Sequence, residues 1–432
     1  MKAYVSKNQL DEDEQALVSI LARKCRDSGD LHAMLKRLFA GGVEQMLEGE
    51  MDEHLGYDKH SPEGRNGGNS RNGYGSKTIT SEYGESEISV PRDRQGTFEP
   101  QVIAKRQTRT DEIEQKVVAM YSKGMTTRDI EDSLRDIYGA EVSSSLISRI
   151  TDKILPDINE WQNRPLESVY AVVFFDGIVF NVRQESKVIK KCVYSLLGIG
   201  MDGRKELLGF WLSENEGASY YASICADLKK RGVRDILIAC HDNLKGLNQA
   251  IHATFPECEQ QLCIIHQIRA SMRFVPEKDR KAVCADLKTI YCAINLDEAE
   301  YAKEAFREKW DKKYPSILKS WDANWAELVT FFKWRLAARS GPGSAESRRD
   351  SFMYAPEIRS LIYTTNAVEG FHRQLRKFTK TRTIFPTDDA IKKAVYLSVR
   401  EISRKWTVTL RNWGLIYGQL MIHFEERISC AS

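Results

Sequence analysis

One stretch constrains the fold of this chain more than any other. Residues 170–183 (YAVVFFDGIVFNVR) are rich in β-branched and aromatic side chains, which predicts a buried strand. A single carboxylate, Asp176, lies in its middle. Burying that charge is costly, so we expect Asp176 either to pair with an arginine or lysine or to hold a metal ion. Gly177 removes a side chain at a point where another group could approach closely.

Length and composition set the broad limits. A chain of 432 residues is long enough for two or three domains with a large core. No run approaches the ~18 apolar residues of a membrane span, and the first residues contain no secretory hydrophobic segment, so we expect a cytoplasmic protein. The nine cysteines have no paired CxxC spacing, which indicates reduced thiols. Because the net charge is only +3, a nucleic-acid surface requires local clusters of basic residues.

The first 110 residues predict helices followed by a small hairpin. Apolar residues recur at intervals of three and four within residues 1–60, which is typical of a helical packing or dimer face. Residues 57–75 are rich in Gly, Asn, Ser and Arg and predict a linker. Residues 77–80 and 87–90 flank a Gly-containing turn and predict a β-hairpin. Arg92 and Arg94 follow it, either in a solvated turn or as phosphate contacts.

Residues 111–155 predict three short helices. Lys123-Gly124 ends the first, Thr126 or Thr127 caps the second, and Ser143 caps the third. This spacing fits a helix-turn-helix, whose last helix would present Ser145 and Arg149 to a DNA groove. Other small helical bundles have the same pattern, so both interpretations stay open at this point.

From residue 170 onward the pattern changes to strands. Residues 191–199 and 206–212 predict two strands joined through Asp202-Gly203, a helix follows at 220–230, and 235–240 predict a further strand. Three antiparallel strands, a helical crossover and another strand is the order of a ribonuclease H-like core. Ligands gather at the carboxyl ends of strands in such sheets, which is where Asp242 lies.

Two later stretches allow more than one interpretation. Cys263 and His266 have a CxxH spacing that suggests zinc, but it matches no finger or ribbon pattern. Residues 277–334 predict helices with a stripe of aromatic side chains. Such a stripe is more often core than a surface on which DNA bases stack.

Glu369 leads a segment that is otherwise purely basic. No acidic residue occurs between 372 and 383, where the basic cluster is Arg373, Arg376, Lys377, Lys380 and Arg382. This pattern suits a carboxylate that faces a metal ion while its neighbours hold phosphates.

Three converging acids, Asp176, Asp242 and Glu369, would stay ionised only around cations. Two Mg²⁺ ions about 3.5–4 Å apart could activate a water or a 3′-hydroxyl and stabilise the leaving oxygen of a phosphodiester.

Sequence motifs along nearly the whole chain carry a family resemblance. They are HLGYDKH (54–60), NSRNGYGSKTI (69–79), PRDRQGTFEPQ (91–101), YSKGMTTRDI (121–130), EWQNRPLE (160–167), HDNLKGL (241–247), QQLCIIHQIR (260–269), YTTNAVEGFHRQLRK (363–377) and RNWG (411–414). With these motifs the chain resembles bacterial insertion-sequence transposases of the Mutator type, which have a DDE catalytic core.

The resemblance implies a site, a cofactor and partners. Asp176, Asp242 and Glu369 would be the catalytic, metal-binding triad, and Cys263 and His266 would support the site rather than ligate zinc. The cofactor would be Mg²⁺, as two ions, with Mn²⁺ able to replace it. The partners would be the double-stranded DNA of terminal inverted repeats and targets, bound by a homodimer or higher oligomer in the bacterial cytoplasm at the nucleoid.

The resemblance also implies a division into parts. We expect a mixed α/β fold with a ribonuclease H-like core, an inserted all-α domain and a preceding DNA-binding region. The parts are an N-terminal helical region (1–60), a linker with a hairpin (61–110), a helix-turn-helix (111–160), the first part of the core (168–270), the inserted helices (271–360), and the second part of the core with the Glu369 helix (361–432).

One segment departs from the family pattern. Relatives pass within a few residues from two aromatics, here Phe331-Phe332, to the Pro-Glu-Ile-Arg at 356–359, whereas residues 335–351 intervene in this chain. We expect a surface loop whose flanks pack as though nearly adjacent. The competing hypotheses are a decayed or repurposed transposase that only binds DNA, and a structure-directed nuclease on the same fold.

Overall fold

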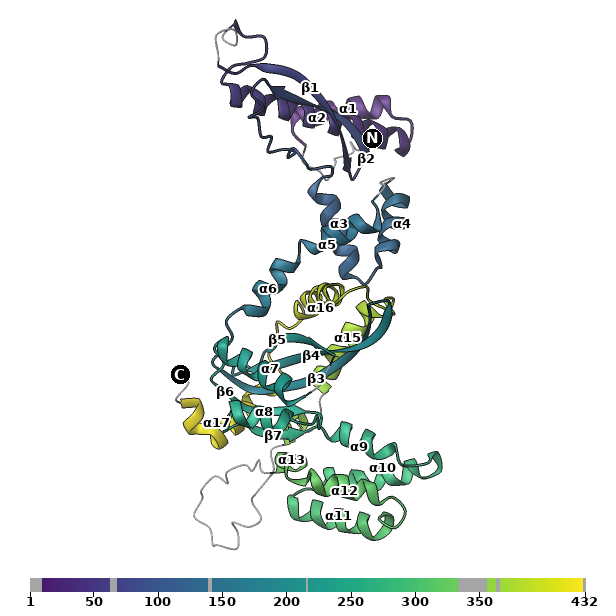
Figure 1. Ribbon diagram of the computed structural model, residues 1–432, viewed down its shortest axis with the longest axis vertical. Helices are drawn as coiled ribbons and strands as arrows, with labels where there is room; N and C mark the ends of the chain where they lie inside the picture. The colour runs from purple at the N-terminus through teal and green to yellow at the C-terminus, as the bar shows by residue number, and fades with distance from the viewer. Residues whose placement is uncertain are drawn as a thin grey trace, which may run out of the picture. The chain divides into compact units, whose positions relative to one another are not determined.

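The computed structural model describes residues 10–62, 68–138, 142–214, 217–332, 356–362 and 366–429. The chain divides into two compact units, Met1–Lys153 and Ile154–Ser432 (Figure 1). In the described part of the chain, no helix is long and apolar enough to cross a membrane.

The first unit begins with helices that pack on a two-stranded sheet. The elements are α1 (Glu12–Lys24), α2 (Ser28–Leu55), β1 (Arg71–Ser81) and β2 (Gly84–Asp93). Val43 and Leu47 of α2 pack against Ile79 and Ile88 of the hairpin. The helices and the hairpin confirm the prediction, but both strands are longer than predicted. The linker prediction is wrong from Arg71 on, because the glycines of this stretch carry no side chain that would reveal a strand.

Three short helices complete the first unit. They are α3 (Asp111–Ser122), α4 (Thr127–Tyr138) and α5 (Ser144–Asp152). Thr126 caps α4, since its Oγ1 accepts a hydrogen bond of 3.2 Å from the Asp129 amide. Ser143 caps α5 as predicted, with its Oγ accepting from the Leu146 amide. Each cap satisfies a backbone N–H that has no partner within the helix.

The second unit is built on a five-stranded mixed sheet. Its strands are β3 (Val169–Gln184), β4 (Lys187–Gly200), β5 (Lys205–Ser213), β6 (Asp235–His241) and β7 (Glu259–Leu262), in the spatial order β5-β4-β3-β6-β7. The first three strands are antiparallel, and β6 and β7 add parallel to β3. The sequence did not predict β7, because its four residues (EQQL) are mostly polar.

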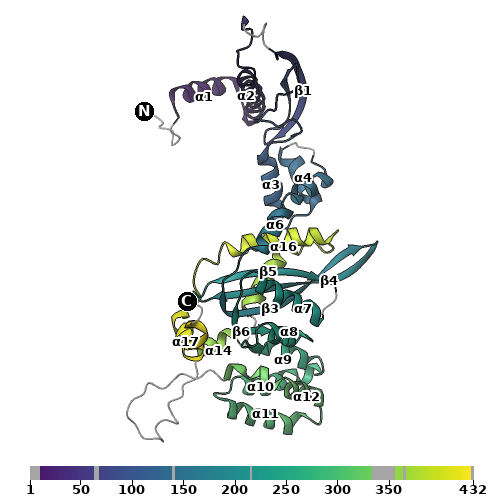
Figure 2. The ribbon, with the colours of Figure 1, turned by 60° about the vertical axis from the view of Figure 1, so that its left-hand side comes forward.

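Helices cover both faces of this sheet. On one face, α7 (Ala218–Lys230) and α8 (Leu247–Thr254) bury Tyr221, Ile224 and Ile251 against Val173 and Phe175 of β3. On the other, α15 (Asn366–Thr379) contacts β3 and β4, while α16 (Asp388–Ser403) contacts β5 and α6 (Leu155–Asn163). Figure 2 shows α16 and α8 on opposite sides of the strands. The C-terminal helix α17 (Trp413–Ser429) is tied to β6 by an ion pair between Arg427 and Asp235.

A helical subdomain follows α9 (Ile264–Met272) and separates the strands of the sheet from α15 along the chain. Its elements are α10 (Glu277–Tyr291), α11 (Leu296–Trp310), α12 (Pro315–Ala323), α13 (Trp325–Leu328) and a 3₁₀ turn (Thr330–Phe332). Trp310, Tyr314 and Trp321 are buried, so the aromatic stripe forms core as expected. The Trp321 indole also donates a hydrogen bond of 3.0 Å to Ser271 Oγ of α9.

The elements on either side of residues 335–351, the segment that departs from the family pattern, contact each other. Residues 335–351, with Trp334, Phe352 and Tyr354, lie outside the described residues. Helix α14 (Pro356–Ile362) contacts the 3₁₀ turn, and the Arg359 guanidinium lies 4.7 Å from the ring centre of Phe332. Arg359 also donates to the carbonyls of Ala293 and Ile294. The chain therefore resumes close to the point at which it departs.

Candidate functional site

Asp176 lies in β3, and Asp242 directly follows the neighbouring strand β6. In the parallel pairing of β3 with β6, Phe175 is the partner of His241, so Asp176 is the next residue of β3 and Asp242 is the first residue after β6. Parallel strands run about 4.8 Å apart, and residues at matched positions point to the same face. Phe175 packs into the core on the α7 and α8 side. Asp176 therefore points to the opposite face, which α15 covers.

Asp176 is a buried carboxylate with a histidine partner. It is only 6% exposed, its Oδ1 accepts a hydrogen bond of 2.9 Å from the Gly177 amide, and its Oδ2 lies 3.4 Å from His372 Nδ1. His372 belongs to α15 and is buried as well. The arginine or lysine considered as a partner for Asp176 is thus a histidine instead.

Gly177 makes room for its neighbours on β4. A Cβ at this position would lie 2.6 Å from Cys192 Sγ and 3.3 Å from the Tyr194 ring. The predicted close approach of another group is confirmed. Any larger residue would push against buried atoms directly beside Asp176.

Helix α9 brings a second histidine toward the two aspartates. Cys263 caps this helix, and its amide donates to the His241 carbonyl at the end of β6. A hydrogen bond between Cys263 and His266 raises the pKa of His266 to about 9; burial opposes this shift, and the charges of Asp176 and Asp242 add to it. His266 therefore lies within electrostatic reach of both aspartates, as a residue that supports the site would.

Glu369 is held by an arginine from α9. Its Oε1 lies 2.7 Å from Arg269 Nη1. Residues three apart on a helix share a face, so Glu369 and His372 are neighbours on α15, and His266 and Arg269 are neighbours on α9. Direct contacts join Asp176 to His372 and Glu369 to Arg269, and His266 is near enough for the charges of the two aspartates to affect it.

The donor chemistry suits Mg²⁺, but the side chains are engaged with each other. Carboxylate oxygens are the ligands that this ion prefers. Among the described residues, no group of three or more His, Cys, Asp or Glu side chains is arranged to hold a metal ion. Asp176 and Asp242 are placed together, whereas Glu369 would join them only after leaving Arg269.

Sequence reasoning missed His372 and Arg269. Each stands three residues after a predicted site residue, His372 after Glu369 and Arg269 after His266. That spacing places them on the same helix faces and could have identified them. What the spacing does not reveal is which acid each of them contacts.

Comparison with known proteins identifies the family. A family profile described as “Transposase, Mutator family” matches residues 11–347 and 344–409. The chain belongs to the Mutator family of transposases. It is 42% identical over 386 residues to a “Probable transposase for insertion sequence element ISRM3-like” from Sinorhizobium fredii, covering 89% of this chain and 90% of the relative. It is 40% identical over 388 residues to the “Transposase for insertion sequence element ISRM3” from Rhizobium meliloti, with coverage of 89% and 90%.

A more distant relative matches nearly the same share of the chain. The “Transposase for insertion sequence element IS256 in transposon Tn4001” from Staphylococcus aureus is 26% identical over 383 residues, covering 88% of this chain and 92% of the relative. The two matched parts of the family profile overlap at residues 344–347, inside the segment 335–351. The interruption noticed in the sequence therefore coincides with a break in the match to the family.

The basic residues predicted to contact DNA are exposed in this transposase. Arg373, Arg376 and Lys377 of α15 are exposed, as is Lys380, which directly follows the helix. On α5, Ser145 and Arg149 are exposed, and Ser145 Oγ lies 3.0 Å from Ser143 Oγ. Exposure is what contact with a nucleic acid requires, and the contact itself stays a prediction.

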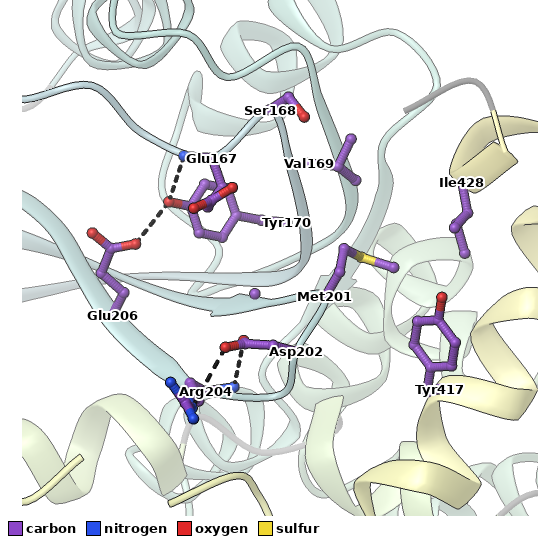
Figure 3. Close-up of a pocket in the computed structure, with 11 residues that line it drawn as sticks. Glu167, Ser168, Val169, Tyr170, Met201, Asp202, Arg204, Glu206, Tyr417 and Ile428 are labelled. Atoms are coloured by element: carbon purple, nitrogen blue, oxygen red, sulfur yellow. Dashed lines mark hydrogen bonds and ion pairs between the residues drawn. The ribbon is translucent and has the colours of Figure 1, made fainter. Parts of the chain in front are cut away.

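A cavity of about 450 Å³ lies elsewhere in the transposase, where β3 and β6 begin (Figure 3). Its lining includes Tyr170 at the start of β3, Gly200 at the end of β4 and Glu206 of β5. The Tyr170 hydroxyl donates a hydrogen bond of 2.8 Å to Glu206, and burial raises the pKa of Tyr170. Asp242 follows the opposite end of β6, so this cavity is separate from the carboxylates.

Proposed function

We propose that this transposase binds the terminal inverted repeats of its insertion sequence and catalyses metal-dependent DNA cleavage and strand transfer. The observation that carries the proposal is the register of β3 with β6, which sets Asp176 beside Asp242 under the helix that bears Glu369. Family membership supports a transposase reaction in general. The three carboxylates are the residues of this chain suited to its chemistry.

The sheet supports a ribonuclease H-like core. Its order β5-β4-β3-β6-β7 combines three antiparallel strands, consecutive in sequence, with two parallel additions. In this arrangement a carboxylate in the middle of β3 and one after β6 share one face. The helices between α9 and α14 would be the inserted all-α domain.

The proposed roles divide between holding charge and binding DNA. Asp176 and Asp242 would hold Mg²⁺, with Glu369 as a further ligand. When bound, the metal would polarise the scissile phosphate and activate the attacking hydroxyl. His266 and His372 orient the aspartates, and Arg269 holds Glu369 in place.

We propose two DNA-binding surfaces from the predicted residues. Exposed Ser145 and Arg149 on α5 would read base edges in the terminal repeats. The basic residues of α15, Arg373, Arg376 and Lys377, with Lys380 directly after the helix, would hold phosphates beside the carboxylates. Double-stranded DNA is the partner, and a dimer or higher oligomer would join two ends.

The test is incubation of the full-length chain with labelled terminal-repeat DNA and Mg²⁺. We expect nicked and strand-transferred products, which EDTA abolishes. A second measurement, independent of activity, follows Mn²⁺ binding by electron paramagnetic resonance in the parent and in Asp242→Asn. Binding that is weaker in the variant supports the aspartate pair as ligands, while equal binding contradicts that role.

Two observations favour a second candidate, a transposase that binds DNA without cutting it. Arg269 occupies the Glu369 carboxylate, and the family match breaks within residues 344–347. Specific binding of terminal-repeat DNA with no product in Mg²⁺ or Mn²⁺ would support this candidate.

A further inference from the structure

A basic groove runs across the first unit beside α5. One cavity of about 560 Å³ lies against the hairpin, and its lining includes Gly75, Arg92, Phe98, Lys105 and Arg106. A second cavity, of about 440 Å³, lies against α5 and is lined in part by Arg106, Arg109, Arg149 and Lys153. Arg106 and Thr108 line both cavities, so the two adjoin each other. We call this pair of cavities the hairpin groove.

The cations of the hairpin groove fall into three classes. Lys77 donates to the backbone carbonyls of Ala104 and Lys105. Lys105, Arg109 and Lys153 form ion pairs with glutamates of the same unit, so their charge is compensated. Arg92, Arg106 and Arg149 are exposed, and none of them forms a hydrogen bond or an ion pair with any residue that the structure describes. Three guanidinium groups without an acidic partner, along one groove, attract an external anion.

Gly75 holds one of these arginines against the hairpin. A Cβ at Gly75 would lie 2.6 Å from Arg92 Nε and 2.7 Å from Arg92 Cζ. The Arg92 guanidinium therefore rests directly on the backbone of β1. The guanidinium occupies the space that a side chain at residue 75 would fill.

The wall of the hairpin groove is held rigidly. Asp93 is 5% exposed and accepts hydrogen bonds from Asn69 Nδ2 at 2.7 Å and from the Thr97 amide at 2.9 Å. Lys77 Nζ donates to the carbonyls of Ala104 and Lys105. These contacts fix the connection between the hairpin and α3, which carries Arg106. A rigid wall lowers the entropy that binding would otherwise cost.

The lining combines charge with apolar surface. Val90, Pro91, Phe98 and Pro100 line the cavity that Arg92 and Arg106 also line. A sugar–phosphate backbone presents both anionic phosphates and apolar sugar faces. This combination matches the groove better than an isolated phosphate ion would, because an ion gives the apolar surface no partner.

We propose that the hairpin groove holds the sugar–phosphate backbone of duplex DNA, with Arg92 and Arg106 as sequence-independent phosphate contacts next to the reading helix α5. The inference rests on the proposed binding of terminal-repeat DNA. It adds, to the base contacts proposed for α5, a second DNA contact from the β-hairpin that does not depend on the base sequence. Arg149 faces the same groove from α5 and would combine the two roles.

The experiment measures the affinity of the full-length chain for two duplexes over a range of salt concentrations. One duplex carries the terminal repeat and the other has the same composition in scrambled order. Arg92→Ala and Arg106→Ala should each weaken binding to both duplexes about fivefold, and each should reduce the salt slope by about 1. Arg149→Ala should weaken binding to the terminal repeat more than to the scrambled duplex. Arg23→Ala, an exposed arginine of α1 that lines neither cavity, is the matched control and should bind as the parent does.

A charge-conserving variant tests the geometry. Gly75→Ala keeps every charge but places a methyl group where the Arg92 guanidinium lies. Because only the end of a flexible side chain has to move, the fold should be retained, which thermal unfolding checks. We expect weaker binding to both duplexes, and no further loss when Arg92→Ala is added.

Parental affinity and salt slope in Arg92→Ala and Arg106→Ala would overturn the inference. Loss on the terminal repeat alone would also overturn it, since that result indicates base reading. Failure of the proposed function is a separate outcome, in which the parent itself shows no preference for the terminal repeat or yields no cleaved product.

Discussion

The carboxylates of the second unit and the arginines of the first unit differ in whether they have a partner within the chain. Asp176 and Glu369 each contact a basic side chain of the same chain, His372 and Arg269 respectively. In the hairpin groove, Arg92 and Arg106 contact no acidic residue in the described part of the chain. One site is compensated internally, and the other is left for a ligand.

This difference has a physical cause. A buried carboxylate such as Asp176 needs polar partners to offset the loss of water, and the fold supplies the Gly177 amide and the His372 imidazole. An exposed guanidinium keeps its water and needs no partner. A ligand of the first site must therefore displace protein contacts, whereas a ligand of the second displaces only water and salt.

The largest effect is expected from removing charge in the compensated site. Asp176→Asn and Glu369→Gln should lower the cleavage rate by at least about 10³-fold, because a preorganised charged group is lost. Binding of terminal-repeat DNA should stay within about twofold, measured by electrophoretic mobility shift. A variant that still cuts at the parental rate would remove that residue from the proposed triad.

Substitution of Asp93, a buried carboxylate of the hairpin groove, tests the stability of the groove rather than DNA binding or cleavage. Asp93→Ala should lower the free energy of unfolding by about 2–4 kcal/mol, because it leaves amide donors of Asn69, Thr97 and Phe98 without an acceptor. Chemical denaturation measures this change. Ser86→Ala, at a buried hydroxyl of the same hairpin, is a milder control.

The same residue predicts a pH dependence. Burial raises the pKa of Asp93, but the hydrogen bonds from Asn69 and Thr97 outweigh it and hold the pKa well below its usual value. A lowered pKa in the folded state adds stability above the unfolded value near 3.8, and this stability is lost as the pH falls below it. The parent should thus lose more stability than Asp93→Ala between pH 5 and about pH 2, and equal losses would contradict the assignment.

The two close-approach glycines should respond differently to the same substitution. Gly177→Ala should cost about 1–3 kcal/mol of stability, since its Cβ would press on the buried Cys192 Sγ. Adding Cys192→Ala should restore part of the loss in a double-mutant cycle. Gly75→Ala, which displaces only an exposed side chain, should leave stability nearly unchanged. Equal destabilisation by both would show that the surface of the hairpin is as tightly packed as the sheet.

The smallest effect is expected from the ion pair at the edge of the compensated site. Arg269 is 59% and Glu369 22% exposed at the side chain, so Arg269→Ala should change the free energy of unfolding by less than about 1 kcal/mol. If the arginine restrains Glu369, the variant should bind Mn²⁺ at least as tightly as the parent. Weaker Mn²⁺ binding would show that Arg269 positions the carboxylate rather than withholding it.

Several features followed from the sequence because they depend on neighbouring residues. The caps at Thr126 and Ser143 were predictable, since a cap is a hydrogen bond over three residues. The strand around Asp176 and the room left by Gly177 followed from side-chain size and periodicity. The short polar strand β7 escaped detection, because it becomes a strand only through pairing with β6.

The sequence by itself determined which chemical groups the site contains: two aspartates at strand positions, a glutamate leading a basic helix, and a cysteine–histidine pair. Only the tertiary structure decided which groups meet. Arg269 and Glu369 are 100 residues apart, and His372 meets Asp176 across the interface of α15 with β3. Such contacts depend on the packing of whole elements, and no local periodicity records them. The hairpin groove is a second case, because Arg92, Arg106 and Arg149 come together only when the hairpin, its connection and α5 have folded.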